Sequence, residues 1–265
     1  MHRIDVPSAT VDHLFTEGSP TAGVPATQVS ASWMNDVQEN IMAVLSAAGV
    51  TPTKGRAADL LDAIVGSTKG RLIGVQTFNS NGTYTPTAGT TSVVVEGVGG
   101  GGGAGGVPAT SASQGGISAS GSPGAYAKGR FTTGFSGVAV GVGTAGAAGT
   151  SSGNGGSGGT TSFGALMSIP GGGGSPFGQV GSSSTNSPAG SAAGAPTGGN
   201  IASSVGVAPQ FALLAAPAIV SLTQSVFSLL GKPGSGGTGG YAPPSTAASA
   251  GTAGNIGTLI IWEYA

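Results

Sequence analysis

Glycine constrains this chain more than any other residue, because it occurs in unbroken runs that carry no side chains at all. The longest runs are Gly99–Gly103 and Gly171–Gly174, and 54 of the 265 residues are glycine. A glycine in a regular element costs about 0.5–1 kcal/mol relative to alanine. Runs of this length are therefore hard to keep unless side chains are sterically excluded. No strict three-residue repeat extends through the region, which excludes a collagen triple helix.

Two interpretations of the glycine runs are open. They are either flexible linkers or extended segments of the polyproline II kind, packed side by side with backbone hydrogen bonds between them. Disordered chains are usually highly charged and poor in apolar residues. This chain is 38% hydrophobic and has only 8 basic and 9 acidic residues. Aliphatic residues such as Val107, Leu166 and Ile169 also punctuate the runs. We therefore predict an ordered structure.

Charge divides the chain into two parts. Residues 1–71 carry twelve of the charged side chains, whereas only Glu96, Lys128, Arg130, Lys232 and Glu263 follow. We expect one domain at 1–71 and a second at 72–265. The net charge of −1 gives no reason to expect nucleic acid as a partner. The N-terminus lacks the apolar core of a secretory signal, so we expect a protein made in the cytoplasm; if it acts outside a cell, release by lysis as part of a particle fits.

The first part predicts two helices after an extended arm. Ser30 or Ser32 caps a helix that begins near Trp33 and ends at Gly49, and a second helix covers about 56–65. Helices this short are marginal alone. They pack either on identical chains around a symmetry axis, which we favour, or on the second part of the same chain. The residues expected to mediate this association and attachment are Trp33, Val37, Ile41, Val44, Leu60 and Ile64.

The second part predicts a small antiparallel sheet with glycine-rich irregular loops. Alternating residues mark strands at 92–98, 138–142 and 258–264, and Asn81-Gly82 predicts a type I′ hairpin between 76–78 and 83–85. The first and last strands are expected to meet, so that the glycine-rich middle projects as loops from a closed base. The fold class is therefore mainly β and glycine-rich irregular, with a short N-terminal α-helical segment.

The residues needed for common enzyme chemistry are scarce. Glycoside hydrolases use a pair of carboxylates, and the second part has only Glu96 and Glu263, which strands of this kind more often leave solvated. No histidine follows His13, so a Ser–His–Asp arrangement within the second part is excluded. The G-x-G-x-x-G spacing after residue 98 leads into more glycine rather than a helix. We expect no catalytic activity, no cofactor and no metal.

The regions expected to contact a binding partner are loops within 107–124, 175–200 and 205–245. Aromatic residues favour interface hot spots, and the candidate contact residues are Phe177, Gln210, Phe211, Phe227 and Tyr241. The apolar stretch 205–231 has two prolines and several polar residues, which favours a soluble segment over a membrane span. It is either contact surface or core along a trimer axis.

The N-terminal stretch resembles the opening of tail fibre proteins from Mu-like phages and related siphophages. The matching elements are the Met-His-Arg-Ile-Asp start, Phe15, Gly18, Pro-Ala-Thr at 25–27, Trp33 followed by Gln38-Glu39, and "KGRAADLLDAI". They cover about the first quarter of the chain. In that family this segment attaches the fibre to the tail.

The rest resembles the glycine-rich domain found at phage tail tips. The pieces that carry this resemblance are "QTFNSNGTYTPTAGTTSVVVEGVGGGGGAGG", "GAYAKGRFTTGFSGVAVGVGTAGAAG", "SFGALMSIPGGGG" and "GNIGTLIIWEYA". Such domains are trimeric and bind surface receptors through distal loops. The resemblance implies a virion adhesin that contacts tail or baseplate proteins and a host receptor, either a polysaccharide or an outer-membrane protein or pilus. The alternative is a structural baseplate or connector protein that binds no receptor.

Overall fold

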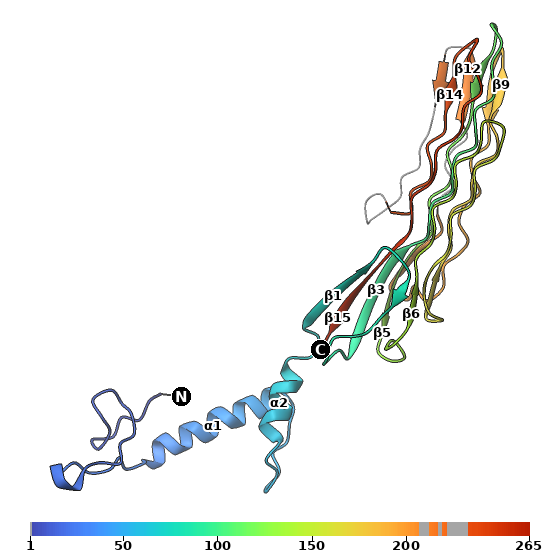
Figure 1. The fold of residues 1–265 in the computed structure, drawn as a ribbon. Helices are drawn as coiled ribbons and strands as arrows, with labels where there is room; N and C mark the ends of the chain where they lie inside the picture. The colour runs from blue at the N-terminus through green and yellow to red at the C-terminus, as the bar shows by residue number, and fades with distance from the viewer. Residues whose placement is uncertain (1, 207–211, 217–218, 222–232) are drawn as a thin grey trace. The chain divides into compact units, whose positions relative to one another are not determined.

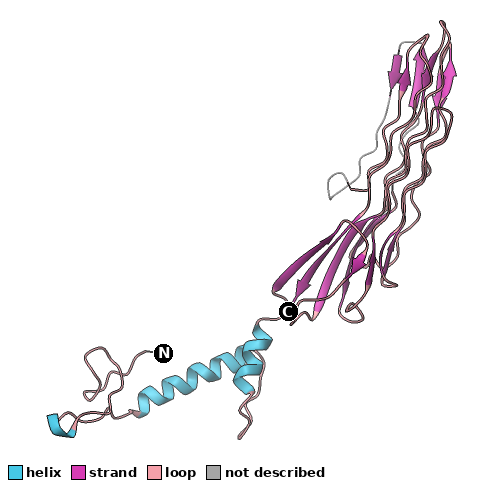
Figure 2. Cartoon of the chain, viewed as in Figure 1, coloured by secondary structure: helices cyan, strands magenta, loops and turns pink. Residues whose placement is uncertain are grey.

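The structure, a computed structural model, describes residues 2–206, 212–216, 219–221 and 233–265 (Figure 1). It divides into two compact units, Met1–Arg71 and Leu72–Ala265. The division falls at the residue where the density of charge drops. The second unit is mainly β and glycine-rich, and the helices belong to the first (Figure 2), so the predicted fold class is confirmed.

Unit 1 contains a 3-10 turn, η1 (Pro20–Ala22), and two helices, α1 (Ala31–Ala47) and α2 (Asp59–Ser67). The helix α1 begins and ends as predicted. The Ser30 hydroxyl accepts a hydrogen bond from the Trp33 amide at 3.3 Å, and Gly49 has a φ of +70° just beyond the last turn.

The second helix starts three residues later than 56. The carboxylate of Asp59 accepts hydrogen bonds from the Thr53 amide at 2.7 Å and from the Arg56 guanidinium at 2.6 Å. These bonds hold residues 53–58 in a loop that folds back onto the first turn of α2, so residues 56–58 do not extend the helix.

The base of unit 2 consists of two antiparallel sheets. The larger has the order β1 (Leu72–Phe78), β15 (Thr258–Tyr264), β3 (Ser92–Val98), β5 (Tyr126–Phe131) and β11 (Ala202–Ser204). The smaller has the order β2 (Gly82–Thr83), β6 (Ala139–Gly141), β7 (Thr161–Phe163) and β8 (Met167–Ile169). The first and last strands pair, with Phe78 opposite Leu259, which confirms that the base is closed by the two ends of the unit.

A single apolar cluster fills the base. Val93 and Val95 of β3 and Leu259 and Ile261 of β15 are fully buried in it, as their alternation predicted. Side chains from the smaller sheet complete the cluster, among them Val140, Phe163, Met167 and Ile169. The core therefore lies at one end of unit 2, where the chain enters and leaves it.

The predicted Asn81-Gly82 hairpin is wrong. β1 pairs with β15 and β2 pairs with β6, so the two flanking segments lie in different sheets. A type I′ turn needs positive φ at both central residues, and neither Asn81 nor Gly82 has one. The Asn81 side chain instead accepts a hydrogen bond from the Val142 amide at 2.8 Å. A hydrogen bond to a residue distant in sequence thus takes the place of the local turn.

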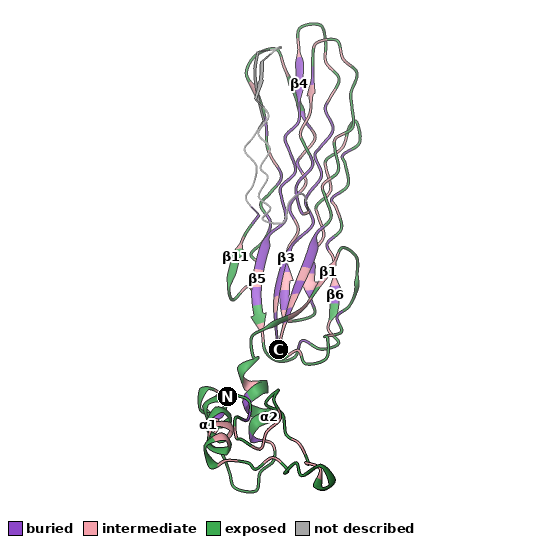
Figure 3. Ribbon diagram, turned by 90° about the vertical axis from the view of Figure 1, so that its left-hand side faces the viewer, coloured by how far each residue is buried: buried purple, intermediate pink, exposed green. Residues whose placement is uncertain are grey.

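Above the base, the glycine-rich runs extend side by side and bond to one another through the backbone. The run 99–107, buried throughout, is at their centre (Figure 3). Its amides donate in rotation to the runs 118–125, 153–159 and 249–256, and its carbonyls accept from the runs 143–149, 170–178 and 234–240. For example, Gly100 donates to Gly159, Gly103 to Gly156 and Gly106 to Gly153, at 2.8–3.0 Å. The period of three is that of a polyproline II helix, so the ordered interpretation of the runs is confirmed.

Glycine is required here because backbones occupy the space of side chains. A Cβ added at Gly100 would lie 2.0 Å from the Thr144 carbonyl oxygen, and one added at Gly103 would lie 2.0 Å from that of Ala147. Such contacts are far inside van der Waals distance. The flanking runs need glycine only on the face turned inward. In the run 143–149 the residues Gly143, Gly146 and Gly149 are buried, whereas Thr144, Ala147 and Ala148 are exposed.

The opposite end of unit 2 carries two small sheets. One has the order β14 (Tyr241–Ala242), β4 (Gly115–Ile117) and β9 (Gln179–Gly181), and the other has the order β10 (Thr185–Ser187), β12 (Ala212–Ala216) and β13 (Ile219–Ser221). They lie far from β1 and the C-terminus (Figure 1). We call this end of unit 2, with its connecting loops, the distal end.

We expect Gly103→Ala to destabilise unit 2 by about 3 kcal/mol, the upper part of the range for overpacking. The added methyl group meets a backbone carbonyl that is itself held by hydrogen bonds. Gly194→Ala is the matched control, because its Cβ would be 3.5 Å from the nearest atom, the Pro170 side chain. Scanning calorimetry on the full chain measures both. Equal melting temperatures for the two variants would contradict the packing described above.

Candidate functional site

The loops at the distal end hold one another in place through hydrogen bonds. The Thr110 hydroxyl donates to the Pro243 carbonyl at 2.5 Å, and the amides of Ser245 and Thr246 donate to Ser111 and to Thr110. Isolated bridging between Val107 and Ser249 adds to these contacts. The segments 108–114 and 243–249 therefore form one surface, although they are separated by more than a hundred residues in sequence.

The exposed side chains of this end are short and uncharged. Serines at 111, 113 and 182–184 are exposed, together with Gln179 and Asn186. Gln179, Ser184, Thr185 and Asn186 line a shallow depression. The charged residues of unit 2 that the structure describes are Glu96, Lys128, Arg130 and Glu263, and all of them lie in strands of the base sheet. Among the described residues, the distal end presents hydroxyl, amide and backbone groups together with a few apolar side chains, Ala109, Ala112 and Val180.

The predicted contact regions are only partly surface. Residues 115–127 are buried, so most of 107–124 is interior, and residues 234–237 of the third region also belong to a buried run. The accessible part of the first region is 109–113 with its half-buried neighbours. Within the runs, glycine recurs at every third position. This spacing could have been used to distinguish bundle residues from loop residues in the sequence.

The candidate contact residues lie partly inside and partly outside the described residues. Phe177 is half-buried, and its amide donates to the Asn154 side chain at 2.7 Å. Tyr241 is also half-buried and packs against Ile117 and Ala119, the small apolar cluster of the distal end. Gln210, Phe211 and Phe227 lie outside the described residues, as does most of the apolar stretch 205–231.

The two carboxylates of the base do not form a catalytic pair. Glu263 is opposite Val93 and Glu96 is opposite Ile260 in the pairing of β15 with β3. Because side chains alternate along a strand, the two carboxylates point to opposite faces of the sheet. Both are buried, Glu96 at 7% and Glu263 at 0% exposure, so the expectation that they are solvated is wrong.

Glu263 is held by neutral donors. Its carboxylate accepts hydrogen bonds from the Tyr84 hydroxyl at 2.7 Å, the Thr87 hydroxyl at 2.6 Å and the Gln76 amide at 2.9 Å. Burial opposes ionisation, but the hydrogen bonds from Thr87, Tyr84 and Gln76 outweigh it and lower the pKa of Glu263. Burial and the same contact raise the pKa of the Tyr84 phenol well above its usual range. The network ties the segment after β2 to the last strand, which is a structural role.

Glu96 belongs to a second network on the other face. Its carboxylate forms an ion pair with the Lys128 ammonium at 3.0 Å and accepts a hydrogen bond from the Tyr126 hydroxyl at 2.9 Å. Burial, together with this bond, raises the pKa of Tyr126 to about 12. The Lys128 ammonium also lies 5.0 Å from the ring centroid of Trp262. The ionisable groups of the base thus have structural partners.

Among the described residues, large apolar side chains are exposed more often in unit 1 than in unit 2. On the two helices, the large apolar side chains with at least a third of their surface exposed are Met34, Ile41, Met42, Val44, Leu60, Leu61, Ile64 and Val65. Only Leu45 of α1 and Ala63 of α2 are buried apolar residues. Of the residues expected to mediate trimerisation, Ile41, Val44, Leu60 and Ile64 are therefore exposed, and Val37 is half-buried.

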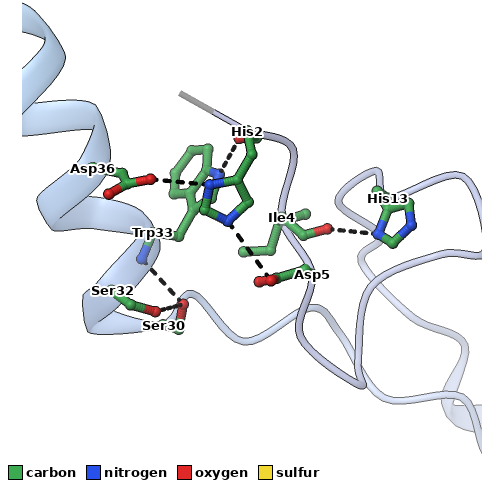
Figure 4. A network of polar contacts seen from close by, with 8 residues as sticks. All are labelled: His2, Ile4, Asp5, His13, Ser30, Ser32, Trp33 and Asp36. Atoms are coloured by element: carbon green, nitrogen blue, oxygen red, sulfur yellow. Dashed lines mark hydrogen bonds and ion pairs between the residues drawn. The ribbon is translucent and has the colours of Figure 1, made fainter.

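Trp33 differs from the rest of that set. Its ring stacks edge-on with Phe15 at 5.2 Å, and its indole N–H donates to the His2 carbonyl at 3.0 Å. The His2 ring lies 3.0 Å from Asp36 and 3.7 Å from Asp5, and His13 contacts the Ile4 carbonyl (Figure 4). These contacts hold the N-terminal arm against α1. Among the described residues, no group of three or more His, Asp or Glu could hold a metal ion.

We expect Glu263→Gln to reduce the free energy of unfolding by about 1–3 kcal/mol at neutral pH, because an amide would turn N–H groups toward donors. The folded pKa of Glu263 is lowered. Its contribution is thus complete above the ordinary glutamate pKa of about 4.3 and is lost as the pH falls below that value toward the folded pKa. Calorimetry across acidic pH tests this, with exposed Glu39→Gln as control. Identical acid sensitivity of wild type and Glu263→Gln would contradict the assignment.

Comparison with known proteins gives a partial sequence match. No protein-family model matches the chain. It is similar to an uncharacterised protein, StfP, of Escherichia coli strain K12, with 37% identity over 70 residues, which cover 24% of this chain and 34% of StfP. The match thus spans about a third of that relative. Neither described helix is long and apolar enough to cross a membrane.

Proposed function

We propose that this protein is a phage tail fibre or tail-tip adhesin. Its unit 1 attaches to tail or baseplate proteins, and the distal end of unit 2 binds a receptor on the host cell surface. The observation that carries this proposal is the distal end itself, an uncharged surface of loops held by a backbone-bonded bundle, opposite the end where the chain enters unit 2. The resemblance of both parts to tail fibre and tail-tip sequences, and the similarity to StfP, support it.

A rigid bundle favours binding by loops. Ordering loops on binding costs free energy, and loops that are already held lose less. Residues 108–114 and 243–249 bond to each other and continue directly into the packed runs. The bundle thus holds the loops away from the base and keeps them ordered before they bind.

The chemistry of the distal end favours a neutral part of the receptor. Hydroxyl and amide side chains recognise sugars or exposed backbone through hydrogen bonds, whereas phosphate or carboxylate groups usually call for Arg or Lys. The described residues of this end have neither. A polysaccharide or the loops of an outer-membrane protein or pilus both offer such groups. The protein would act in the virion, at the tail tip.

A structural connector without a receptor is the second candidate. The exposed apolar surface of unit 1 favours it equally, because attachment to tail proteins is common to both functions. We further propose that the protein is not an enzyme, since Glu96 and Glu263 point to opposite faces of one sheet. Release of reducing ends from host polysaccharide by the purified chain would overturn that part.

We expect the fluorescently labelled full chain to stain host cells and to compete with phage adsorption. Arginine at two distal serines, Ser113→Arg with Ser183→Arg, should weaken staining at least about tenfold, a loss of about 1.4 kcal/mol. Ser136→Arg is the matched control, because it adds the same side chain to an exposed position at the base. Calorimetry establishes that all variants remain folded.

Two results would contradict the adhesin. If the wild-type chain neither stains cells nor blocks infection, the protein is a structural connector and not an adhesin. If the base variant loses as much binding as the distal variant, the contact surface is not at the distal end. Because the described residues of the distal end carry no charge, we also expect binding to change by less than about twofold between low and high salt.

A further inference from the structure

Two side-chain amides of unit 2 differ from the others because they have no hydrogen-bond partner within the chain. Gln179 and Asn186 are exposed, and neither side chain bonds to any residue that the structure describes. The two amides are therefore available to a ligand. The other described Asn and Gln side chains of unit 2 are all engaged in hydrogen bonds, namely those of Gln76, Asn79, Asn81, Gln114, Asn154, Asn200 and Asn255.

Both of these amides line the same depression at the distal end. Its lining residues are Gln179, Ser184, Thr185 and Asn186, and its volume is about 330 Å³. Sites for small molecules measure about 300–1,000 Å³, so this depression has room for a small ligand or for one residue of a polymer. Gln179 begins β9, and Thr185 and Asn186 belong to β10, so the depression lies where the two small sheets adjoin. We call it the distal depression.

The bundle fixes the β9 side of the distal depression. The Gly178 amide, directly before Gln179, donates to the carbonyl of Gly106 in the central run at 2.8 Å. Gln179 itself is opposite Ile117 in the pairing of β9 with β4, and Ile117 is fully buried. The backbone of Gln179 is thus held both by the central run and by a buried strand.

The β10 side is fixed by contacts with the interior. Ser187 is fully buried, and its hydroxyl accepts a hydrogen bond from the Ala119 amide at 3.3 Å. Because side chains alternate along a strand, Asn186 points away from this interior. A Cβ added at Gly181 would lie 2.0 Å from the Thr185 hydroxyl oxygen, so glycine is needed for Thr185 to lie there. Groups held in this way lose little freedom when a ligand binds.

The chemistry of the lining favours an uncharged sugar. Amide and hydroxyl side chains both donate and accept hydrogen bonds, and the hydroxyl groups of a sugar do the same. The described residues of the distal end have no Arg or Lys, which phosphate and carboxylate ligands usually require. A protein ligand usually anchors through a large aromatic or apolar side chain in a matching pocket, and none of the four described lining residues is apolar.

We propose that the distal depression binds an uncharged sugar residue of a polysaccharide on the host cell. This inference rests on the proposed function, because it names the ligand of the distal end. Gln179 and Asn186 supply the principal hydrogen bonds, and Ser184 and Thr185 complete the lining. The contact is small and polar, so we expect a Kd of about 1 mM or weaker for a single sugar. Several copies of the chain in one virion would bind a repeating polysaccharide more tightly.

NMR titration of the isotope-labelled full chain tests the site directly. The probes are glucose, galactose, mannose and N-acetylglucosamine, with galacturonate as the charged comparison. We expect at least one of the four uncharged sugars to shift the side-chain amide signals of Gln179 and Asn186 in a saturable way, and galacturonate to shift them less. The absence of a saturable shift with all four would overturn the proposal, as would an equal or larger response to galacturonate.

Substitution of the free amides tests their role. Gln179→Ala combined with Asn186→Ala should weaken sugar binding at least about tenfold, because two hydrogen-bonding groups are lost. Asn186→Asp, which keeps the size of the side chain and removes its N–H donors, should weaken it as well. Gln28→Ala is the matched control, because it removes an exposed amide from unit 1 and should bind as the wild type does. Wild-type affinity in the double variant would contradict the assignment.

Staining of treated host cells distinguishes a sugar receptor from a protein receptor. Periodate cleaves the vicinal diols of sugars, whereas a protease digests exposed proteins. We expect staining by the full chain to be lost after periodate and kept after protease. The reverse result would leave the adhesin in place and overturn the sugar ligand. If untreated cells are not stained at all, the adhesin fails, and the NMR titration alone decides whether the distal depression binds sugar.

Discussion

The packing of bare backbone against bare backbone is the constraint on which the rest of unit 2 depends. The run 99–107 donates hydrogen bonds in three directions and accepts them from three others, so its polar groups are satisfied without side chains. This is possible only at the close distances that glycine allows, since an added Cβ would collide with a neighbouring carbonyl. Among the described residues, the main apolar core fills the base, and only a small cluster around Ile117 and Ala119 lies at the distal end. The bundle is thus stabilised chiefly by its hydrogen bonds and its dense contact.

In unit 2, the residues that make the bundle stiff are not the loop residues that are proposed to bind a receptor. The bundle consists of runs whose inward faces tolerate almost no substitution, whereas the loops 108–114 and 243–249 are free of that restriction apart from their mutual hydrogen bonds. The ionisable residues Glu96 and Glu263 are committed to networks that fasten the base. The charges are therefore structural at one end, and the uncharged groups are accessible at the other. Such a division suits an adhesin whose loops vary on a fixed support.

Unit 1 follows a different logic. Its helices bury little within the unit, and its arm is attached to α1 by Trp33, Phe15 and His2. Several large apolar side chains of α1 and α2 are left exposed. A protein that must join a larger particle gains from such a surface, because burial of apolar area then occurs on assembly.

Local patterns determined several elements of the fold. Ser30 and Gly49 fixed α1, and the alternation in 92–98 and 258–264 fixed two strands and their buried faces, because caps and side-chain periodicity depend on neighbours in sequence. Composition determined that glycine was needed for close approach. The pairing of the first and last strands of unit 2 was also predicted from the sequence. Only the tertiary structure decided that β2 pairs with β6, so that Asn81-Gly82 forms no hairpin. It also decided that Glu96 and Glu263 are buried on opposite faces, and that loops distant in sequence share one surface. Those outcomes depend on contacts between residues far apart in the chain, which no local pattern encodes.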